Sequence, residues 1–399
     1  MNDAADDRPP LVVLASTYPR YAGDHEPSFV HELARRLTRE FQVTAVVPHA
    51  AGSLESEVLD GVRVVRYRYA PVALETLVND GGMISNLQRS PWKWLLVPSF
   101  IVMQWVAARR HIRKASIVHV HWLLPQGLVA WALGKPYMVT CHGADVFSLR
   151  GGVAMRAKQL VARNAKKVSV VSRAMCEPVD ALTVTGHSSV MPMGVDLRSR
   201  FTPEAGITRD VGHVLFVGRL VEKKGLDVLL KAMPNVLSKH PGARLSVVGH
   251  GPMASEMQTL ASTLGIDASV RFVGPLPQTE LPSLYRRASV FVAPFRVAAS
   301  GDVDGLGLVS VEALGCACPV VASSVEGARD VFEGIQGAIL VPPADPEALA
   351  AALIQVLDNE ARFHHLAAED RDVLIRRFDW DAVASGYAGA LAELRVSDS

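Results

Sequence analysis

The chain has 399 residues, of which 49% are hydrophobic and 20% charged, and its formal net charge is +1. This length exceeds one ordinary domain and the composition excludes a disordered chain, so we expect two globular domains. The near balance of 41 basic and 40 acidic residues gives no electrostatic reason to expect a nucleic-acid partner. Four cysteines, with Cys316 and Cys318 too close together for an easy bridge, favour a reducing, cytoplasmic setting.

Short apolar, β-branched runs alternate with helical stretches along the chain. Phe29–Arg39, for example, places its apolar side chains on one helical face. Strand-like runs that are apolar on both faces predict parallel sheets covered by helices on each side, which is an α/β fold. The predicted strands form a first set, Leu11–Ser16, Val43–Pro48, Val62–Arg68, Ile117–Trp122, Tyr137–Cys141 and Lys167–Ser172, and a second set, His213–Gly218, Arg244–Gly249, Val270–Gly274, Val290–Pro294, Pro319–Ser323 and Ala338–Pro342.

The stretch Met191–Glu204 separates the two sets and has neither strand nor helix periodicity. Its mixture of proline, glycine and charge predicts an interdomain linker, or alternatively a long surface loop. We therefore expect one domain over residues 1–195 and a second over residues 205–377. Ligands of open parallel sheets bind beyond the carboxyl ends of the strands, so two sheets facing each other predict a central cleft.

The first motif is the segment Gly218–Gly225, which follows a predicted strand and precedes a helix beginning near Leu226. Arg219 offers a planar fork of donors and Lys224 a compact ammonium group, which together can neutralise a diphosphate. The free amides of the helix N-terminus add to this positive field. A basic turn in solvent is the alternative, but glycines on both sides and the strand–helix setting favour an anion site.

The second motif is Asp304–Leu314, in which Gly305 and Gly307 allow a ligand to approach the backbone. A helix follows this glycine-bearing turn. Carboxylates accept hydrogen bonds from vicinal hydroxyls, so Asp304 suits a sugar and Glu312 a ribose. The motif gains weight because it occurs together with the basic loop at Gly218–Gly225.

The third motif is Thr140–Asp145, at the end of a first-domain strand. His142 in this position is predicted to donate to a substrate oxygen, and Asp145 to bind substrate. The alternative is a histidine that only caps the strand.

Two patterns raise the question of a metal. His119 and His121 lie on one face of a predicted strand, and His142 follows a neighbouring strand. Histidines in this arrangement can bind zinc, so a zinc hydrolase is one enzyme class that the sequence leaves open. Asp302 and Asp304 spell the Asp-x-Asp pattern that can bind a divalent cation, but Arg219 and Lys224 already supply positive charge. We therefore predict a metal-independent enzyme without a cofactor.

The chain resembles glycosyltransferase family 4, whose members have the GT-B fold, over nearly its whole length. The order and spacing of several motifs carry this resemblance, in the stretches ASTYPRYAGDHEPSFVHELA, HVHWLLPQGLVA, CHGADVF, VMPMGVD, VGRLVEKKGLDVLL and DGLGLVSVEAL. The resemblance implies two Rossmann-like domains, the first binding the acceptor and the second binding a nucleotide diphosphate sugar as donor substrate. The last segment, roughly residues 378–394, would pack back on the first domain.

The resemblance also implies a role for each matching residue. Arg219 and Lys224, beside Gly218, would hold the donor diphosphate, and Glu312 the ribose hydroxyls. His142 would contact the transferred sugar and stabilise charge near the reacting carbon. Gly23, in the loop after the first strand, would lie close to the diphosphate. Val273, at a strand end, would contact the nucleotide base. The backbone of the second glycine-bearing loop would also face the donor, at Gly305, Leu306, Gly307 and Leu308.

The implied mechanism is retention by front-face substitution, in which the departing phosphate accepts the proton of the acceptor hydroxyl. The chain departs from the family pattern at two places. The first acid of the paired-acid motif is usually glutamate and here is Asp304, and the loop at Gly23 is less glycine-rich than in many relatives.

The non-enzymatic alternative is a scaffold that binds sugar nucleotides without turnover.

The segment 90–114 is apolar and rich in tryptophan, and it closes with five basic or histidine side chains. Lys93 and two prolines interrupt it, which argues against a membrane span. Its composition suits an interfacial helix on anionic lipid, and the alternative is an ordinary helix packed on the sheet. The interfacial interpretation predicts peripheral attachment to the inner face of a membrane and a lipid-linked hydroxyl acceptor.

Overall fold

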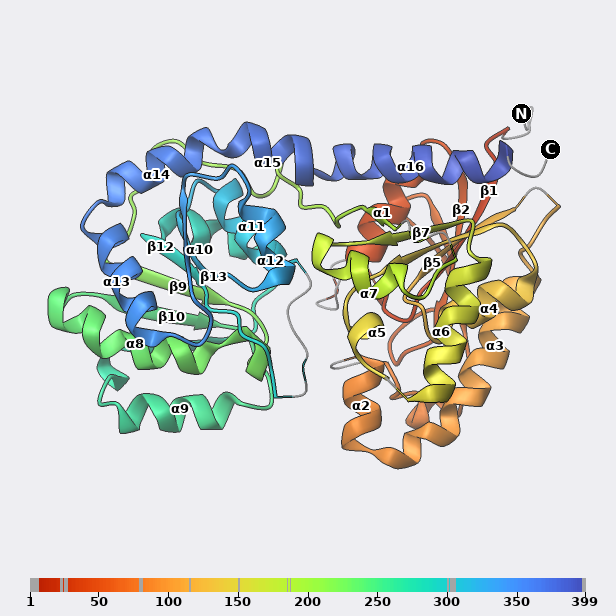
Figure 1. Ribbon diagram of the computed structural model, residues 1–399, viewed down its shortest axis with the longest axis horizontal. Coiled ribbons are helices and arrows are strands. Elements are labelled where there is room, and N and C mark those ends of the chain that lie inside the picture. The colour runs from red at the N-terminus through yellow and green to blue at the C-terminus, as the bar shows by residue number, and fades with distance from the viewer. Residues whose placement is uncertain are drawn as a thin grey trace. The chain divides into compact units, whose positions relative to one another are not determined.

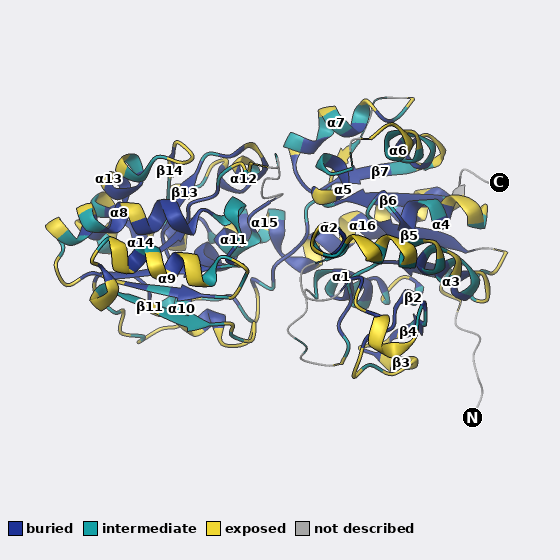
Figure 2. Ribbon diagram, turned by 90° about the horizontal axis from the view of Figure 1, so that it is seen from below, coloured by how far each residue is buried: buried dark blue, intermediate teal, exposed yellow. Residues whose placement is uncertain are grey.

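The computed structural model describes residues 7–21, 24, 28–78, 82–114, 116–149, 151–184, 186, 188–299, 301 and 306–396. The chain divides into two compact units (Figure 1). Unit 1 comprises Met1–Met193 and Val383–Ser399, and unit 2 comprises Gly194–Ala382. In each unit the central strands are buried and most helices keep an exposed outer face (Figure 2).

The described strands of unit 1 form one sheet in the order β3-β4-β2-β1-β5-β6-β7-β8. Neighbours pair in parallel, except that β3 runs antiparallel to β4. The strands are β1 (Pro10–Leu14), β2 (Gln42–Pro48), β3 (Ser56–Leu59), β4 (Val62–Tyr67), β5 (Ile117–His121), β6 (Tyr137–Cys141), β7 (Lys167–Val170) and β8 (Ser189–Val190).

Helices follow most strands of unit 1, as crossovers in a parallel sheet require. Among them, α3 packs on α4 and α4 on α6. They are α1 (Phe29–Leu37), α2 (Met83–Arg89), α3 (Val97–Arg109), α4 (Gln126–Leu133), α5 (Ala144–Phe147), α6 (Gly152–Asn164) and α7 (Cys176–Asp180), with short 3₁₀ turns η1 (Val72–Leu74), η2 (Pro91–Leu96) and η3 (Arg173–Met175).

The described strands of unit 2 form an all-parallel sheet in the order β11-β10-β9-β12-β13-β14. The strands are β9 (His213–Val217), β10 (Arg244–Val248), β11 (Val270–Gly274), β12 (Val290–Ala293), β13 (Val320–Ser323) and β14 (Ala338–Val341). The helical elements are η4 (Glu222–Lys224), α8 (Leu226–Lys239), α9 (Ala254–Thr263), η5 (Asp267–Ser269), α10 (Leu281–Arg287), α11 (Leu308–Gly315), α12 (Glu326–Phe332), α13 (Pro346–Leu357), α14 (Glu360–Glu369) and α15 (Arg371–Phe378).

Two hydrophobic cores cover the two faces of the unit 2 sheet. Val214 and Phe216 of β9 point into a core with α8 and α13, whereas Leu215 and Val217 point into a core with α10 and α11. This division follows from the period of two along a strand, which sends successive side chains to opposite faces. The prediction of α/β sheets covered on both faces is confirmed.

The predicted strands are all present, and two short ones escaped prediction. β3 has the sequence SEVL, and its Val58 is 72% exposed, so it carries little of the apolar signal of a buried strand. β8 has only two residues, both exposed. Such edge elements form because a neighbouring strand offers unpaired backbone groups, which is information outside the segment itself.

The stretch Met191–Glu204, predicted as a linker or a long surface loop, contains the change from unit 1 to unit 2 between Met193 and Gly194, and part of it is packed into a core. Leu197 and Phe201 are buried in the core of unit 2, and Val195 forms a parallel bridge with Asp379. The last helix, α16 (Trp380–Val396), begins beside that bridge in unit 2 and belongs to unit 1 from Val383 onward (Figure 1). The chain thus changes unit twice.

Candidate active site

The basic loop Gly218–Gly225 lies at the carboxyl end of β9, as predicted. Leu220 N donates to His250 O at 2.9 Å, and a Cβ on Gly249 would lie 1.9 Å from Gly218 O. On its other side, a Cβ on Gly225 would lie 1.8 Å from Pro294 O. The loop is therefore packed tightly between the ends of β10 and β12, where the backbones approach too closely for side chains.

Arg296 fastens this loop from outside the motif. Its backbone N donates to Lys223 O at 3.0 Å, and its guanidinium pairs with Glu222 and Asp227, both at 3.2 Å. These contacts fix the turn that carries Lys223 and Lys224. The sequence analysis missed Arg296 because it lies some seventy residues away from the loop, in a segment without a motif of its own.

Phe295 brings the two motifs of unit 2 together. The Lys224 ammonium lies 4.8 Å from the centroid of the Phe295 ring, a cation–π contact. A Cβ on Gly307 would lie 2.8 Å from the same ring. Gly307 has φ +73° and directly precedes α11, so the basic loop and the glycine turn converge on one buried aromatic side chain.

Glu312 projects from α11 and is 6% exposed. Tyr285 donates its hydroxyl to Glu312 Oε2 at 3.0 Å, and Gln278 donates to Oε1 at 3.4 Å. Burial raises the pKa of Glu312 to about 7, against the opposing effects of these hydrogen bonds and of the charges on Arg200 and Lys224. The effect of Lys224 places the carboxyl group within electrostatic reach of the basic loop.

The other residues predicted for the donor side fall into two groups. Arg219 and Gly218 lie in the basic loop, Leu306 and Leu308 flank Gly307, and Val273 lies on the edge strand β11. Asp304 and Gly305, like Asp302 and Gly23, lie outside the described residues.

In unit 1, His142 follows β6 and lies among aromatic rings. Its ring centroid is 5.1 Å from Phe29 and from His121, and 4.9 Å from Trp122. Trp122 has φ +72°, a conformation that a bulky residue adopts only under constraint and that often marks functional sites. Burial lowers the pKa of His142 to about 3, so its ring is neutral at neutral pH.

Asp145 holds the backbone around His142. Its Oδ1 accepts from His142 N and Gly143 N, both at 3.0 Å, and its Oδ2 accepts from Leu123 N at 2.9 Å. These bonds tie the loop after β6 to the loop after β5. Asp145 is 8% exposed, so this geometry favours a role in positioning His142.

The histidines of the rival zinc interpretation have other partners. His119 Nε2 lies 2.9 Å from Thr140 Oγ1, and His121 Nδ1 lies 2.9 Å from His142 Nε2. Among the described residues, no group of three or more His, Cys, Asp or Glu side chains is arranged to hold a metal ion. Asp302 and Asp304 fall outside that search.

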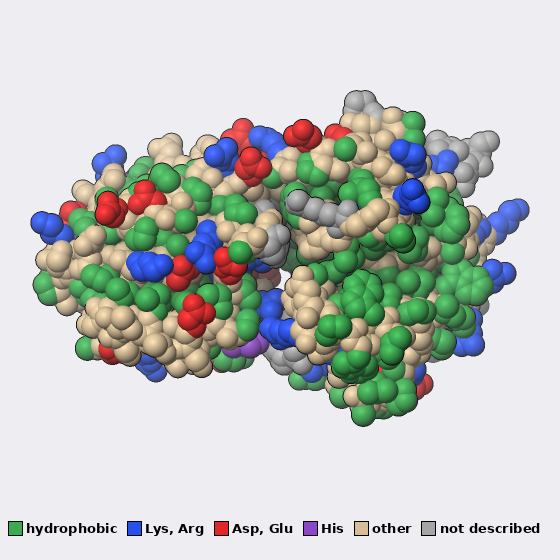
Figure 3. Space-filling model, turned by 60° about the horizontal axis from the view of Figure 1, so that its bottom comes forward, with side chains coloured by type: hydrophobic (Ala, Val, Ile, Leu, Met, Phe, Trp, Pro, Cys, Tyr) green, Lys and Arg blue, Asp and Glu red, His purple; other side chains and the backbone are tan. Residues whose placement is uncertain are grey.

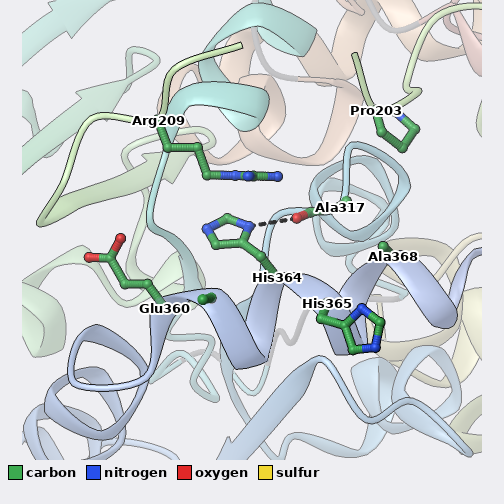
Figure 4. A pocket seen from close by; sticks show the side chains of 8 residues that line it. Pro203, Arg209, Ala317, Glu360, His364, His365 and Ala368 are labelled. Carbon is green, nitrogen blue, oxygen red and sulfur yellow. Dashed lines mark hydrogen bonds between the residues drawn. The ribbon is translucent and has the colours of Figure 1, made fainter. Parts of the chain in front are cut away.

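A pocket of about 550 Å³ lies elsewhere in unit 2. His364 Nδ1 of α14 donates to Ala317 O over 2.8 Å within it, and Arg209 and Glu360 also line it (Figure 4). Since a backbone carbonyl only accepts, His364 Nδ1 carries the proton in this bond. None of the motif residues lines this pocket, so we do not place the donor there.

Among the described helices, none is both long and apolar enough to cross a membrane.

Comparisons with known proteins follow the same division of the chain. Residues 28–199 match the family described as "Glycosyltransferase Family 4", and residues 200–373 match "Glycosyl transferases group 1". A GDP-mannose-dependent alpha-(1-6)-phosphatidylinositol monomannoside mannosyltransferase of Mycolicibacterium smegmatis is 27% identical over 96% of this chain and 99% of its own. A D-inositol 3-phosphate glycosyltransferase of Corynebacterium jeikeium is 31% identical over 92% of this chain and 91% of its own.

Among solved structures, sucrose-phosphate synthase of Thermosynechococcus elongatus shares the fold with a TM-score of 0.79 at 22% identity, over 98% of this chain and 100% of that one. Together, these matches span both units and agree with the paired parallel sheets. The chain therefore belongs to glycosyltransferase family 4, has the GT-B fold, and is a glycosyltransferase that uses a nucleotide sugar.

Proposed function

We propose that this enzyme transfers a hexose, with retention of the anomeric configuration, from a nucleotide diphosphate sugar to a hydroxyl group of a lipid-linked acceptor. The observation that carries the donor assignment is the convergence of Lys224 and Gly307 on Phe295. It brings together the Lys224 ammonium, the start of α11 and, through the electrostatic effect of Lys224, the Glu312 carboxyl. The acceptor class is supported by the name of the Mycolicibacterium smegmatis relative, whose acceptor is a phosphatidylinositol mannoside and therefore a lipid. The Corynebacterium jeikeium relative is named for D-inositol 3-phosphate, which carries no lipid, so a small soluble hydroxyl compound is the alternative acceptor.

In this proposal, Arg219 and Lys224 hold the diphosphate and stabilise the negative charge that grows on it as the sugar departs. Glu312 accepts hydrogen bonds from the ribose hydroxyls. Val273 and the backbone of Gly305 to Leu308 contribute further donor contacts, together with Gly23. Positive side chains would then replace the divalent cation that other glycosyltransferases use, so no metal would be required.

His142 of unit 1 would contact the transferred sugar, and Asp304 would bind one of its hydroxyls. The departing phosphate would take the proton of the acceptor hydroxyl on the face from which it leaves, which preserves the anomeric configuration. Unit 1 would thus bind the acceptor, and residues 205–377 the donor. Product of inverted configuration, seen in the anomeric coupling of its NMR spectrum, contradicts this mechanism.

The donor assignment is tested by thermal shift with UDP-, GDP- and ADP-sugars in EDTA. One donor is expected to stabilise the wild type, because a ligand that binds only the folded state raises its melting temperature. Arg219→Ala is expected to weaken that donor roughly tenfold to hundredfold, the usual effect of losing charge-assisted hydrogen bonds. Arg244→Ala is the matched control, since Arg244 is an exposed arginine at the opposite, amino end of β10.

If Arg244→Ala weakens the donor as much as Arg219→Ala, the basic loop is not the diphosphate site. If stabilisation appears only when a divalent cation replaces EDTA, metal-independent binding is wrong.

We also propose that one face of unit 1 attaches to anionic membranes. Hydrophobic side chains gather over the part of unit 1 shown in Figure 3. In the segment 90–114, Trp92, Trp94 and Leu95 are 49%, 48% and 81% exposed, and Trp131 of the adjoining α4 is 45% exposed. Apolar side chains of this size in water favour insertion into a lipid interface.

The helix α3, which follows η2 in this segment, is packed on the sheet. Phe100 and Gln104 of α3 are fully buried, whereas Val102 is 55% exposed and Arg109 lies over the Trp105 ring at 5.1 Å. The buried face of α3 agrees with an ordinary helix packed on the sheet, whereas the exposed Trp92, Trp94 and Leu95 of η2 support the interfacial interpretation. The exposed basic residues that close the segment 90–114, Arg109, Arg110, Arg113 and Lys114, match the negative charge of anionic headgroups.

A further inference from the structure

The ring of His121 lies directly beside the ring of His142. His121 Nδ1 and His142 Nε2 are 2.9 Å apart, and the two rings are nearly parallel, with an interplanar angle of 22°. His121 ends β5 and is 1% exposed, whereas His142, on the loop after β6, is half-buried. The more deeply buried ring therefore lies behind the one that we place against the sugar.

A hydrogen bond between two imidazoles fixes where each carries its proton. Burial lowers the pKa of His142 to about 3 and that of His121 well below its ordinary value, so both rings are neutral. A neutral imidazole has one N–H and one lone pair, so one ring must donate and the other accept. The direction of this bond decides which nitrogen of His142 holds its proton.

The surroundings of His121 favour one direction. Within the described residues, the only hydrogen bond of its imidazole ring is the one between Nδ1 and His142. A proton on Nε2 would give this ring, in a side chain that is 1% exposed, an N–H with no acceptor among the described residues, and such N–H groups are rarer in proteins than unused lone pairs. His121 is thus expected to carry its proton on Nδ1 and to donate it to His142 Nε2. His142 then keeps its own proton on Nδ1, where it can donate to a ligand.

Other contacts hold His142 in place but leave its tautomer open. Asp145 accepts from the backbone N of His142, and Phe29 and Trp122 contact the ring only through aromatic faces and edges. These contacts restrict where the ring lies and how it turns. Among the described residues, His121 alone has a hydrogen bond to the imidazole nitrogens of His142.

We propose that His121 is a positioning residue for the glycosyl transfer, which holds His142 in the tautomer with its proton on Nδ1. The role rests on the proposed function, in which His142 contacts the transferred sugar. It gives that side chain a fixed hydrogen-bond donor without a positive charge. The donor is aimed before the substrate arrives, so no proton has to move for the contact to form.

The direct test is ¹⁵N NMR of the histidine rings in the protein without substrate, with His142 assigned by comparison with His142→Gln. In the wild type we expect a protonated Nδ1 and an unprotonated, hydrogen-bonded Nε2. His121→Phe keeps a stacked ring but removes the donor, so His142 should become a mixture of both tautomers. His121→Asn places an amide N–H near the position of Nδ1 and should restore the single tautomer.

His119→Phe is the matched control. His119 lies on the same strand face, its ring centroid is 4.4 Å from that of His121, and it is fully buried, but its hydrogen bond goes to Thr140. A loss of packing alone would affect both variants alike. Only His121→Phe should change the tautomer of His142, and an unchanged His142 in that variant overturns the proposal.

Kinetics supply the second readout. His121→Phe should lower kcat about tenfold or more with a smaller loss of donor affinity, because the loops that hold the diphosphate and ribose lie in unit 2 and His142 contacts only the sugar, and His121→Asn should recover most of kcat. An equal loss in His121→Asn and His121→Phe contradicts the proposal. Wild-type turnover by His142→Gln would refute the proposed role of His142 instead, and the substrate-free NMR experiment distinguishes the two failures.

Discussion

Glu312 shows how a single site residue depends on side chains far from it in the sequence. Its carboxyl group is recognisable from the motif, but its chemistry is set by burial, by Tyr285 and Gln278, and by the charge of Lys224. Burial favours the protonated form, and the hydrogen bonds and positive charges favour the carboxylate. The balance brings the pKa to about 7, within the range where small changes of pH alter its charge.

This pKa predicts that donor affinity rises with pH. The carboxylate accepts two hydrogen bonds from ribose hydroxyls more strongly than the protonated acid does, so affinity should fall below pH 7, by up to tenfold per unit, and level off above it. Titration calorimetry with an intact nucleotide sugar between pH 5.5 and 8.5 measures this, because its diphosphate diester does not titrate in that range. Glu312→Gln should bind more weakly and with no such dependence. A flat profile in the wild type contradicts the ribose role.

At the scale of elements, the donor loops are held by the ends of neighbouring strands. The basic loop after β9 packs against the end of β10 on one side and against Pro294, after β12, on the other. Gly225 has φ +68° and no room for a side chain. Both its backbone conformation and its close contact with Pro294 therefore require a glycine at this position. A loop fixed in this way presents Arg219 and Lys224 without needing to be ordered by the ligand.

This packing predicts a large effect of Gly225→Ala on stability and on donor affinity. A matched control exists in Gly265, which has φ +69° but no atom within 4 Å of an added Cβ. Gly265→Ala should cost about 1–2 kcal/mol of unfolding free energy from backbone strain alone. Gly225→Ala should cost about 1–3 kcal/mol more through the clash with Pro294. Urea unfolding measures both, and equal losses would mean that the close contact is not needed.

At the scale of the whole molecule, the apolar face of unit 1 predicts binding to anionic vesicles. The variant Trp92→Ser/Leu95→Ser should weaken binding to phosphatidylglycerol-containing vesicles about tenfold or more, since each exposed side chain gains about 1.5–3 kcal/mol when buried in an apolar phase. Arg109→Gln/Arg110→Gln should weaken it mainly at low salt, where electrostatic attraction is least screened. Co-sedimentation measures both.

The control for this surface is Val153→Ser, which removes an apolar side chain that is 84% exposed on α6. It should leave vesicle binding unchanged. Equal binding to vesicles of phosphatidylcholine alone, or no effect of either double substitution, would contradict the interfacial assignment of the segment 90–114.

The sequence determined the strands and the motif loops because their signals are local. A buried parallel strand is apolar on both faces, and the glycines beside Arg219 and before α11 mark loops. The sequence therefore predicted the α/β class, the succession of strands along the chain and the residues Arg219, Lys224, His142 and Glu312 as site candidates. Edge strands such as β3, whose stability comes from a neighbour, gave no such signal.

Only the tertiary structure decided which side chains support these candidates. Phe295 and Arg296 brace the basic loop, Tyr285 and Gln278 hold Glu312, and His121 forms a hydrogen bond with His142. The same holds for Leu197 and Phe201, which turn an expected linker into part of a core. Each of these contacts joins residues distant along the chain, and parallel sheets bring such residues together because every crossover returns the chain to the same edge.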